Sequence, residues 1–143
     1  MQSPELLKLF AESVLNTSEK VYTFISIPVK YWQNVLQMVP ANEFLSITKD
    51  REDEISMIVE TEVWESLDTS SLEFIASDGW KLFSLYGEGL MDAAGYLAKI
   101  CLLLAQNNIT LMAFSTFKKS HLLVKDADYK KAQAILKIFL SQH

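Results

Sequence analysis

The sequence predicts an α+β protein built from two ferredoxin-like units in tandem, with antiparallel sheets and helices on one face. Segments typical of strands and helices follow one another as strand, helix, strand, strand, and this order occurs twice along the chain. The strand segments are rich in β-branched and aromatic residues, whereas the helix segments carry apolar residues at helical spacing. Each half of the chain therefore contains most of a split βαβ plan.

An N-terminal helix precedes the two units. Ser3 offers a capping hydroxyl, Pro4 fits the first turn, and Glu5 lies near the positive end of the helix dipole. Apolar residues at helical spacing follow, and the helix should fade near residues 16–17. We therefore assign residues 1–17 to this helix.

The first unit, residues 18–77, begins with a strand and a helix. Residues 21–27 (VYTFISI) alternate enough between β-branched, aromatic and polar types to form a strand, and Pro28 ends it. Residues 30–39 carry apolar side chains at helical spacing, and Pro40 closes that helix.

Two further strands follow in the first unit, at residues 44–48 and 55–63. The charged segment 49–54 (KDREDE) joins them and is most simply a solvated hairpin tip. Residues 64–77 either form a short second helix or cross over to the next unit. The first unit is thus a divergent, ferredoxin-like copy of the second.

The second unit, residues 78–143, follows a turn expected at Asp78-Gly79. A strand at residues 80–86 leads into a glycine-bearing turn at 87–95 and then into an apolar helix at 96–106. Since each unit alone would be marginal in size, we expect the two units to share a sheet edge or a helical layer.

The end of the second unit is the most informative part of the chain. Residues 109–126 (ITLMAFSTFKKSHLLVKD) form two short apolar runs that hinge on a Ser-Thr-aromatic turn. A helix at residues 127–140 follows directly. This arrangement favours a small-molecule sensing module over an active site.

Composition restricts the function further. The 143 residues are 50% hydrophobic and 22% charged, which is ordinary for a folded globular protein. The formal net charge of −5 disfavours nucleic-acid binding, because only the lysine pairs 118–119 and 130–131 could form a basic patch. The lone Cys101 permits no internal disulfide, and no signal peptide or membrane span is evident, so we expect a cytoplasmic protein.

Catalytic interpretations of single residues are weak. Cys101 lies among apolar helix residues and is better explained as an inert buried thiol than as a nucleophile. His121 is better explained as a surface or half-buried histidine than as a base or ligand. Ser115, His121 and Asp126 could be written as a triad, but no nucleophile-elbow motif surrounds the serine. With no metal constellation or phosphate loop, we expect a non-enzyme without a cofactor.

A family resemblance rests on the Ser115-Thr116-Phe117 triplet, followed by residues 121–125 (HLLVK) and a helix. This pattern resembles the signature of small bacterial proteins built from tandem ACT domains. The likeness extends back through Gly95 and the strand at residues 80–86. It covers the C-terminal half of the chain, whereas the N-terminal half is similar only in the order of its elements.

The resemblance implies a regulatory fold that binds an amino acid or similar metabolite at an interface between two ACT units. It also implies a second copy of the chain as partner, in a homodimer. In such proteins the turn after the first strand contacts the ligand, together with residues near the second and third strands. Carried over to this chain, the implied ligand-binding residues are Glu88, Gly89, Leu90, Asp92, Gly95, Phe114, Ser115, Thr116 and Ser120.

Two departures from the family pattern concern the ligand. The family commonly has proline, leucine and aspartate after the first glycine, where this chain has Glu88, Gly89 and Leu90. The family also commonly has an aspartate shortly after the triplet, where this chain has Lys119 and Ser120. Ser120 cannot hold a cation by charge, so the resemblance does not fix the identity of the ligand.

Elementary chemistry supports a half-site for an amino acid at the same turn. Free N–H groups at a helix start near residues 92–95 can accept a carboxylate, and a glycine lets the backbone approach closely. Glu88 or Asp92 could hold the ammonium group, although Asp92 equally suits a helix cap. An equally good interpretation of Ser115 and Thr116 is that they hydrogen-bond their own turn and contact no ligand. The alternative from another class is an interaction protein that dimerises through sheet edges and binds no metabolite.

Overall fold

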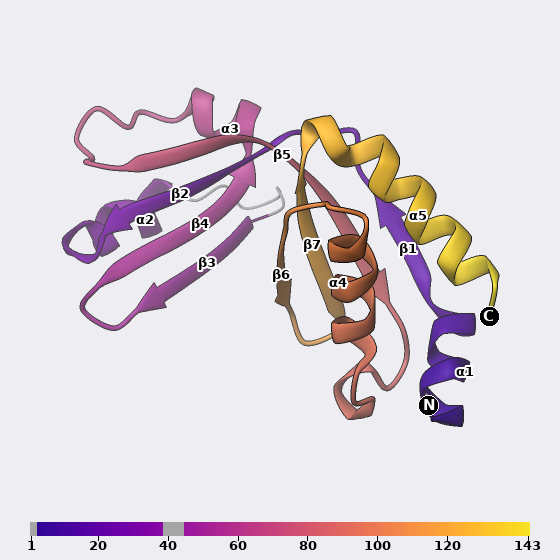
Figure 1. Ribbon diagram of the computed structural model, residues 1–143. Helices are drawn as coiled ribbons and strands as arrows, with labels where there is room; N and C mark the ends of the chain where they lie inside the picture. Colours follow the sequence, from indigo (N-terminus) through magenta and orange to yellow (C-terminus); the bar gives the residue numbers. More distant parts are fainter. Residues whose placement is uncertain (1–2, 39–44) are drawn as a thin grey trace. The chain divides into compact units, whose positions relative to one another are not determined.

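The computed structural model describes residues 3–38 and 45–143, which form two compact units (Figure 1). The inserted unit is Lys20–Trp80, and the flanking unit consists of residues up to Glu19 together with Lys81–His143. Both are ferredoxin-like, so the predicted α+β fold class is confirmed. These units differ from the predicted ones, 18–77 and 78–143, mainly in the N-terminal segment. The sequence predicts it as a separate helix, but its contacts group it with the flanking unit.

The inserted unit has the complete order strand, helix, strand, strand, helix, strand, with the sheet order β3-β4-β2-β5. Its β2–β4 and β3–β4 pairs are antiparallel, as is the pairing of β2 with β5. Its elements are β2 (Tyr22–Pro28), the 3₁₀ turn Val29–Tyr31, α2 (Trp32–Met38), β3 (Leu45–Asp50), β4 (Glu54–Glu60), α3 (Thr61–Ser66) and β5 (Ile75–Tyr86), which continues into the flanking unit.

Alternation along the strands builds the core of the inserted unit. Every second residue of β2 and β4 is fully or almost fully buried and packs with Val35 of α2 and Trp64 of α3. The other face carries Ser26, whose hydroxyl donates to Glu54. The buried strand residues of this cluster are Ile25, Ile27, Ile55, Met57 and Val59.

Three sequence predictions in this unit are adjusted by the structure. The strand predicted at residues 55–63 ends at Glu60, because the chain turns into α3 at Thr61, whose N–H donates to the Val21 carbonyl at 2.9 Å. The open choice for residues 64–77 resolves into the end of α3, a connection and the start of β5. Pro40 and Phe44, predicted to end a helix and start a strand, lie outside the described residues.

The turn predicted at Asp78-Gly79 is wrong, because β5 runs unbroken through both residues. Tyr22 pairs with Trp80 and Phe24 with Ser77, so β5 has one residue more than β2 across this interval. Gly79, with φ of 81°, forms part of this β-bulge, and the Thr23 hydroxyl donates to the Asp78 carboxylate at 2.8 Å. An Asp-Gly pair that by itself predicts a turn is thus held in a strand by pairing with the neighbouring strand β2.

The flanking unit completes its sheet with an N-terminal strand. β1 (Val14–Thr17) pairs antiparallel with β5, from Val14 opposite Tyr86 to Thr17 opposite Phe83, and the sheet order is β1-β5-β7-β6. The helix predicted over 1–17 therefore ends earlier, at Glu12. The remaining elements are α1 (Pro4–Glu12), the 3₁₀ turn Leu90–Asp92, α4 (Tyr96–Gln106), β6 (Leu111–Ser115), β7 (Lys119–Lys125), the 3₁₀ turn Asp126–Asp128 and α5 (Tyr129–Ser141).

Helices α1, α4 and α5 and one face of the strands enclose the core of the flanking unit (Figure 1). Phe10 of α1 is fully buried, and its ring stacks on Tyr96 of α4 with centroids 5.1 Å apart. The Ser3 hydroxyl caps α1 by accepting from the N–H of Leu6 at 3.1 Å, as predicted. The N-terminal segment is therefore an integral part of this core.

Candidate functional site

The glycine turn, residues 86–93, connects β5 to the helical layer of the flanking unit. Gly87 is buried against α1, and a Cβ there would lie 2.5 Å from Leu9 Cδ1. Gly89 has φ of 84°, a left-handed conformation that favours glycine. The Leu90 N–H then donates to the Gly87 carbonyl at 3.3 Å, which starts a 3₁₀ turn. The turn is thus fixed on one side by α1.

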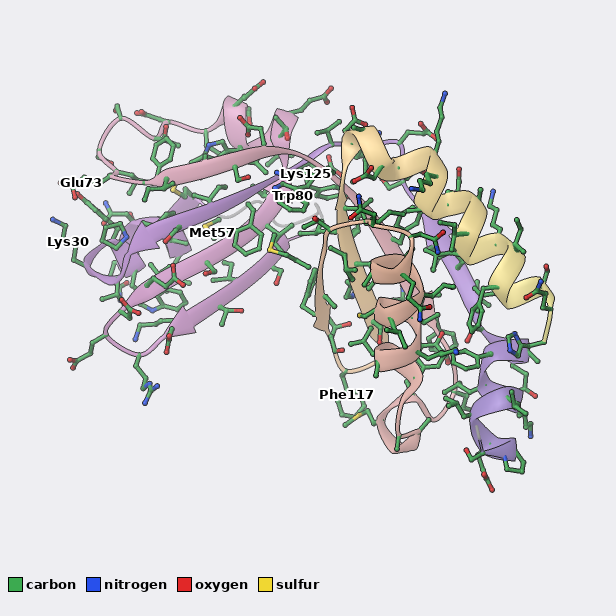
Figure 2. All side chains as sticks on the ribbon, in the orientation of Figure 1. Lys30, Met57, Glu73, Trp80, Phe117 and Lys125 are labelled. Carbon is green, nitrogen blue, oxygen red and sulfur yellow. The ribbon has the colours of Figure 1, made fainter. Side chains whose placement is uncertain are left out.

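The aromatic hollow lies between the glycine turn and the turn that joins β6 to β7. Its volume is about 310 Å³. Tyr86, Met91 and Phe117 are 42%, 71% and 79% exposed. Figure 2 shows Phe117 where the β6–β7 hairpin turns. The charged residues of its described lining are Glu88 and Lys118, one of each sign. The described lining is residues 86–91 with Phe117 and Lys118.

The acidic hollow lies on the other side of the same turn, against α1. Its volume is about 330 Å³, and Glu88 and Gly89 line both hollows. Lys8, the one basic residue of its lining, pairs with Glu12 at 3.9 Å on the helix surface. Its full lining is Glu5, Lys8, Leu9, Glu12, Glu88, Gly89 and Ala93.

The β6–β7 hairpin is organised around a buried histidine. Both ring nitrogens of His121 hydrogen-bond to hydroxyls, Nδ1 to Ser84 Oγ at 2.8 Å and Nε2 to Thr116 Oγ1 at 3.1 Å. Phe114 stacks on the imidazole with centroids 4.9 Å apart. His121 is only 4% exposed, whereas the sequence predicts a surface or half-buried position. Burial, and secondly the positive charge of Lys119, lower the pKa of His121.

The structure separates the predicted site residues into two groups. Glu88, Gly89 and Leu90 line the aromatic hollow. The others fall outside its lining. A Cβ on Gly95 would lie 3.7 Å from Leu6 of α1, and the side chain of Asp92 lies outside the described part of the chain.

The predicted residues of the hairpin have structural positions instead. Phe114 and Thr116 hold His121, and the Thr116 N–H also donates to the Lys119 carbonyl at 3.0 Å. Ser115 is exposed and pairs in register with Ser120, which is buried. Their assignment as ligand contacts stays a prediction.

Sequence reasoning missed Lys118 as a lining residue of the hollow, whereas Phe117 ends the facing segment 114–117 that the family resemblance implies. Phe117 belongs to the Ser-Thr-aromatic triplet that marked the hairpin turn. The available signal was an aromatic residue and a lysine at the tip of a hairpin, where side chains are exposed. Elsewhere, Cys101 is half-buried rather than buried as predicted, and this partial burial raises the pKa of its thiol, which disfavours the reactive thiolate.

One segment of the chain matches a known protein family, and it contains β5, the glycine turn and the β6–β7 hairpin. Residues 75–137 match the family model of the ACT domain. The ACT match begins at Ile75 and spans β5, α4, β6 and β7, and part of α5. It supports an ACT-domain protein over this part of the chain. No curated protein matches the chain.

Solved structures share the whole fold at low sequence identity. A protein of unknown function from Vibrio cholerae, described as a possible transport protein, is 18% identical with a TM-score of 0.72, over 95% of this chain and 96% of that one. A protein from Agobacterium tumefaciens is 22% identical with a TM-score of 0.70, over 87% of both chains. The ligand-free regulatory subunit of aspartate kinase from Thermus thermophilus is 12% identical with a TM-score of 0.64, over 88% and 97%.

No helix within residues 3–38 and 45–143 is long and apolar enough to cross a membrane. Among the side chains that the structure describes, no group of three or more His, Cys, Asp or Glu residues could hold a metal ion.

The contact of Gly87 with α1 gives a first prediction. Gly87→Ala should lower the free energy of unfolding by about 1–3 kcal/mol, because the added methyl group overlaps the buried Leu9 side chain. Leu9→Val removes the overlapping Cδ1 atom. Gly87→Ala should therefore cost about 1 kcal/mol less in the Leu9→Val protein than in the parent. Urea denaturation of the four proteins measures this coupling, and additive losses would contradict the proposed overlap.

The lowered pKa of His121 gives a second prediction. A histidine whose pKa is lower in the folded state contributes full stability above its ordinary pKa of about 6.5 and loses it as the pH falls toward the folded-state value. The free energy of unfolding should therefore decrease between pH 7.5 and pH 5, and less so in His121→Gln. His143→Gln is the control and should keep the parental slope. Equal slopes for parent and His121→Gln would refute the assignment.

Proposed function

We propose that the chain is a non-catalytic regulatory module of two ACT-like units that binds an amino acid or similar small metabolite at the glycine turn. The ACT match and the regulatory-subunit fold support a small-ligand-binding regulatory module in general. The observation that carries the proposal is the aromatic hollow, which has a volume of about 310 Å³ and is lined by the glycine turn on one side and the hairpin tip on the other. This volume is at the small end of ligand sites and suits a molecule the size of an amino acid.

The backbone of the turn supports the same proposal. Gly89 adopts a left-handed conformation, and a Cβ added to it would have no atom within 4 Å, so the backbone is open to an approaching ligand. Glu88 and Lys118 supply charges of both signs at the hollow, as a zwitterion requires. The ACT–ACT interface that the resemblance implies for the ligand stays a prediction, as do a homodimer and a cytoplasmic location.

A thermal-shift screen tests the proposed function. The common amino acids and nucleotides are added at millimolar concentration, and one of the amino acids should raise the melting temperature. A ligand at one hundred times its dissociation constant adds about 2.7 kcal/mol, which is a shift of several degrees for a chain of this size. Gly89→Val, which strains the left-handed turn as well as filling the open space beside it, should abolish the response. The absence of any shift with all amino acids would overturn the proposal.

An interaction protein without a ligand is the second candidate, and an exposed strand favours it. Within the inserted unit β5 lies at an edge of the sheet, and its first four residues, 75–78, are exposed. Ile75 is 78% exposed on this strand, and the preceding Phe74 is 38% exposed. Exposed apolar edges of this kind can pair with another strand.

The second candidate predicts self-association through this edge. Light scattering over a concentration series should then give a mass above that of one chain. Ile75→Lys places a charge on the edge strand and should return the mass to that of a monomer. Ser71→Lys, in the exposed connection before the strand, is the matched control and should leave the mass unchanged. A dimer that survives Ile75→Lys would place the contact elsewhere.

A further inference from the structure

We propose that the aromatic hollow selects amino acids with an apolar side chain over those with a charged one. This inference rests on the proposed function and names the ligand class of that site. Three of the lining side chains, Tyr86, Met91 and Phe117, offer two aromatic rings and a thioether. Among the side chains that the structure describes, the lining holds two ionisable carboxyl or amine groups, Glu88 and Lys118.

The two charges are both used by the part that all amino acids share. Lys118 can donate to the α-carboxylate, and Glu88 can accept from the α-ammonium group. A ligand bound in this way meets no further charged partner for an ionised side chain among the described lining side chains. An ionised side chain without a partner gains more from water than from this open hollow, whereas an aliphatic or aromatic side chain can cover the exposed ring of Phe117 and the Met91 thioether.

The acidic hollow across the same turn fits this class of ligand poorly. Its lining has three glutamates, Glu5, Glu12 and Glu88, against Lys8 alone. Lys8 also lies 3.9 Å from Glu12, so among the described lining residues carboxylates outnumber the one cation. Carboxylate repulsion there favours the aromatic hollow for a zwitterion with an apolar side chain.

Isothermal titration calorimetry of the full chain tests the selectivity. The probes are L-leucine, L-methionine and L-phenylalanine, with L-lysine and L-aspartate for comparison. The apolar probes should bind about tenfold more tightly than the charged ones, because their side chains can cover the exposed ring and thioether, whereas an ionised side chain keeps its water. Phe117→Ser should weaken the apolar probes by roughly tenfold through the loss of ring contact.

Two analogues separate the roles of the charges. 2-Phenylethylamine lacks the carboxylate, and 3-phenylpropanoate lacks the ammonium group. Lys118→Gln should weaken L-phenylalanine by roughly tenfold or more but leave 2-phenylethylamine unaffected, because a charged hydrogen bond is lost only with the first probe. Glu88→Gln should weaken L-phenylalanine and leave 3-phenylpropanoate unaffected. Lys8→Gln, in the acidic hollow, is the matched control and should change none of these affinities.

The outcomes distinguish this inference from the proposed function. The proposed selectivity is wrong if L-lysine or L-aspartate binds more tightly than the apolar probes, or if Phe117→Ser leaves the affinities of the apolar probes unchanged. Either result leaves the proposed regulatory module standing. If no amino acid binds at all, the proposed function itself is overturned. Circular dichroism of each variant checks the fold, which the substitutions at exposed Glu88, Phe117 and Lys118 should preserve.

Discussion

The pairing of β1 with β5 is the constraint on which the flanking unit depends. β1 supplies the outer strand of the sheet, and the chain that precedes it folds back as α1 over the core. Lys81, which is almost fully buried, fastens the end of this segment by donating to the Glu19 carbonyl at 2.8 Å, and its ammonium lies 5.0 Å from the Tyr129 ring centroid. Residues at the start of the chain thus complete a unit whose other elements come after Trp80.

The same segment connects packing to the candidate site. α1 positions Leu9 against Gly87, and this contact leaves no room for a side chain on the inner side of the glycine turn. The outer side of the turn remains exposed at Glu88 and Gly89, next to the hairpin tip. On the opposite wall, His121 fixes the hairpin from within through Ser84 and Thr116. Both walls of the aromatic hollow are therefore supported by buried contacts, while the groups that could meet a ligand are exposed.

The sequence predicts well those features that have a local cause. Ser3 and Pro4 mark the start of α1, and alternation marks the strand that becomes β2, because capping and pleating depend on neighbouring residues. It does not predict β1, because residues 14–17 follow a helical pattern and become a strand only through pairing with β5. Nor does it predict that Asp78-Gly79 stays within a strand, because the β2 neighbour imposes that conformation. The site shows the same division. The glycine turn can be predicted from its own residues, whereas the position of Phe117 and Lys118 opposite that turn depends on the fold.

The register of β1 and β5 also bears on how such a chain could arise. Thr17 and Phe83 face each other as partners in the β1–β5 ladder, so the inserted unit leaves and returns to the flanking unit at opposed positions on adjacent strands. A short β-hairpin loop could close that gap in place of the whole insertion. The flanking unit therefore has the geometry of a single domain in which a second one takes the place of a hairpin connection between β1 and β5.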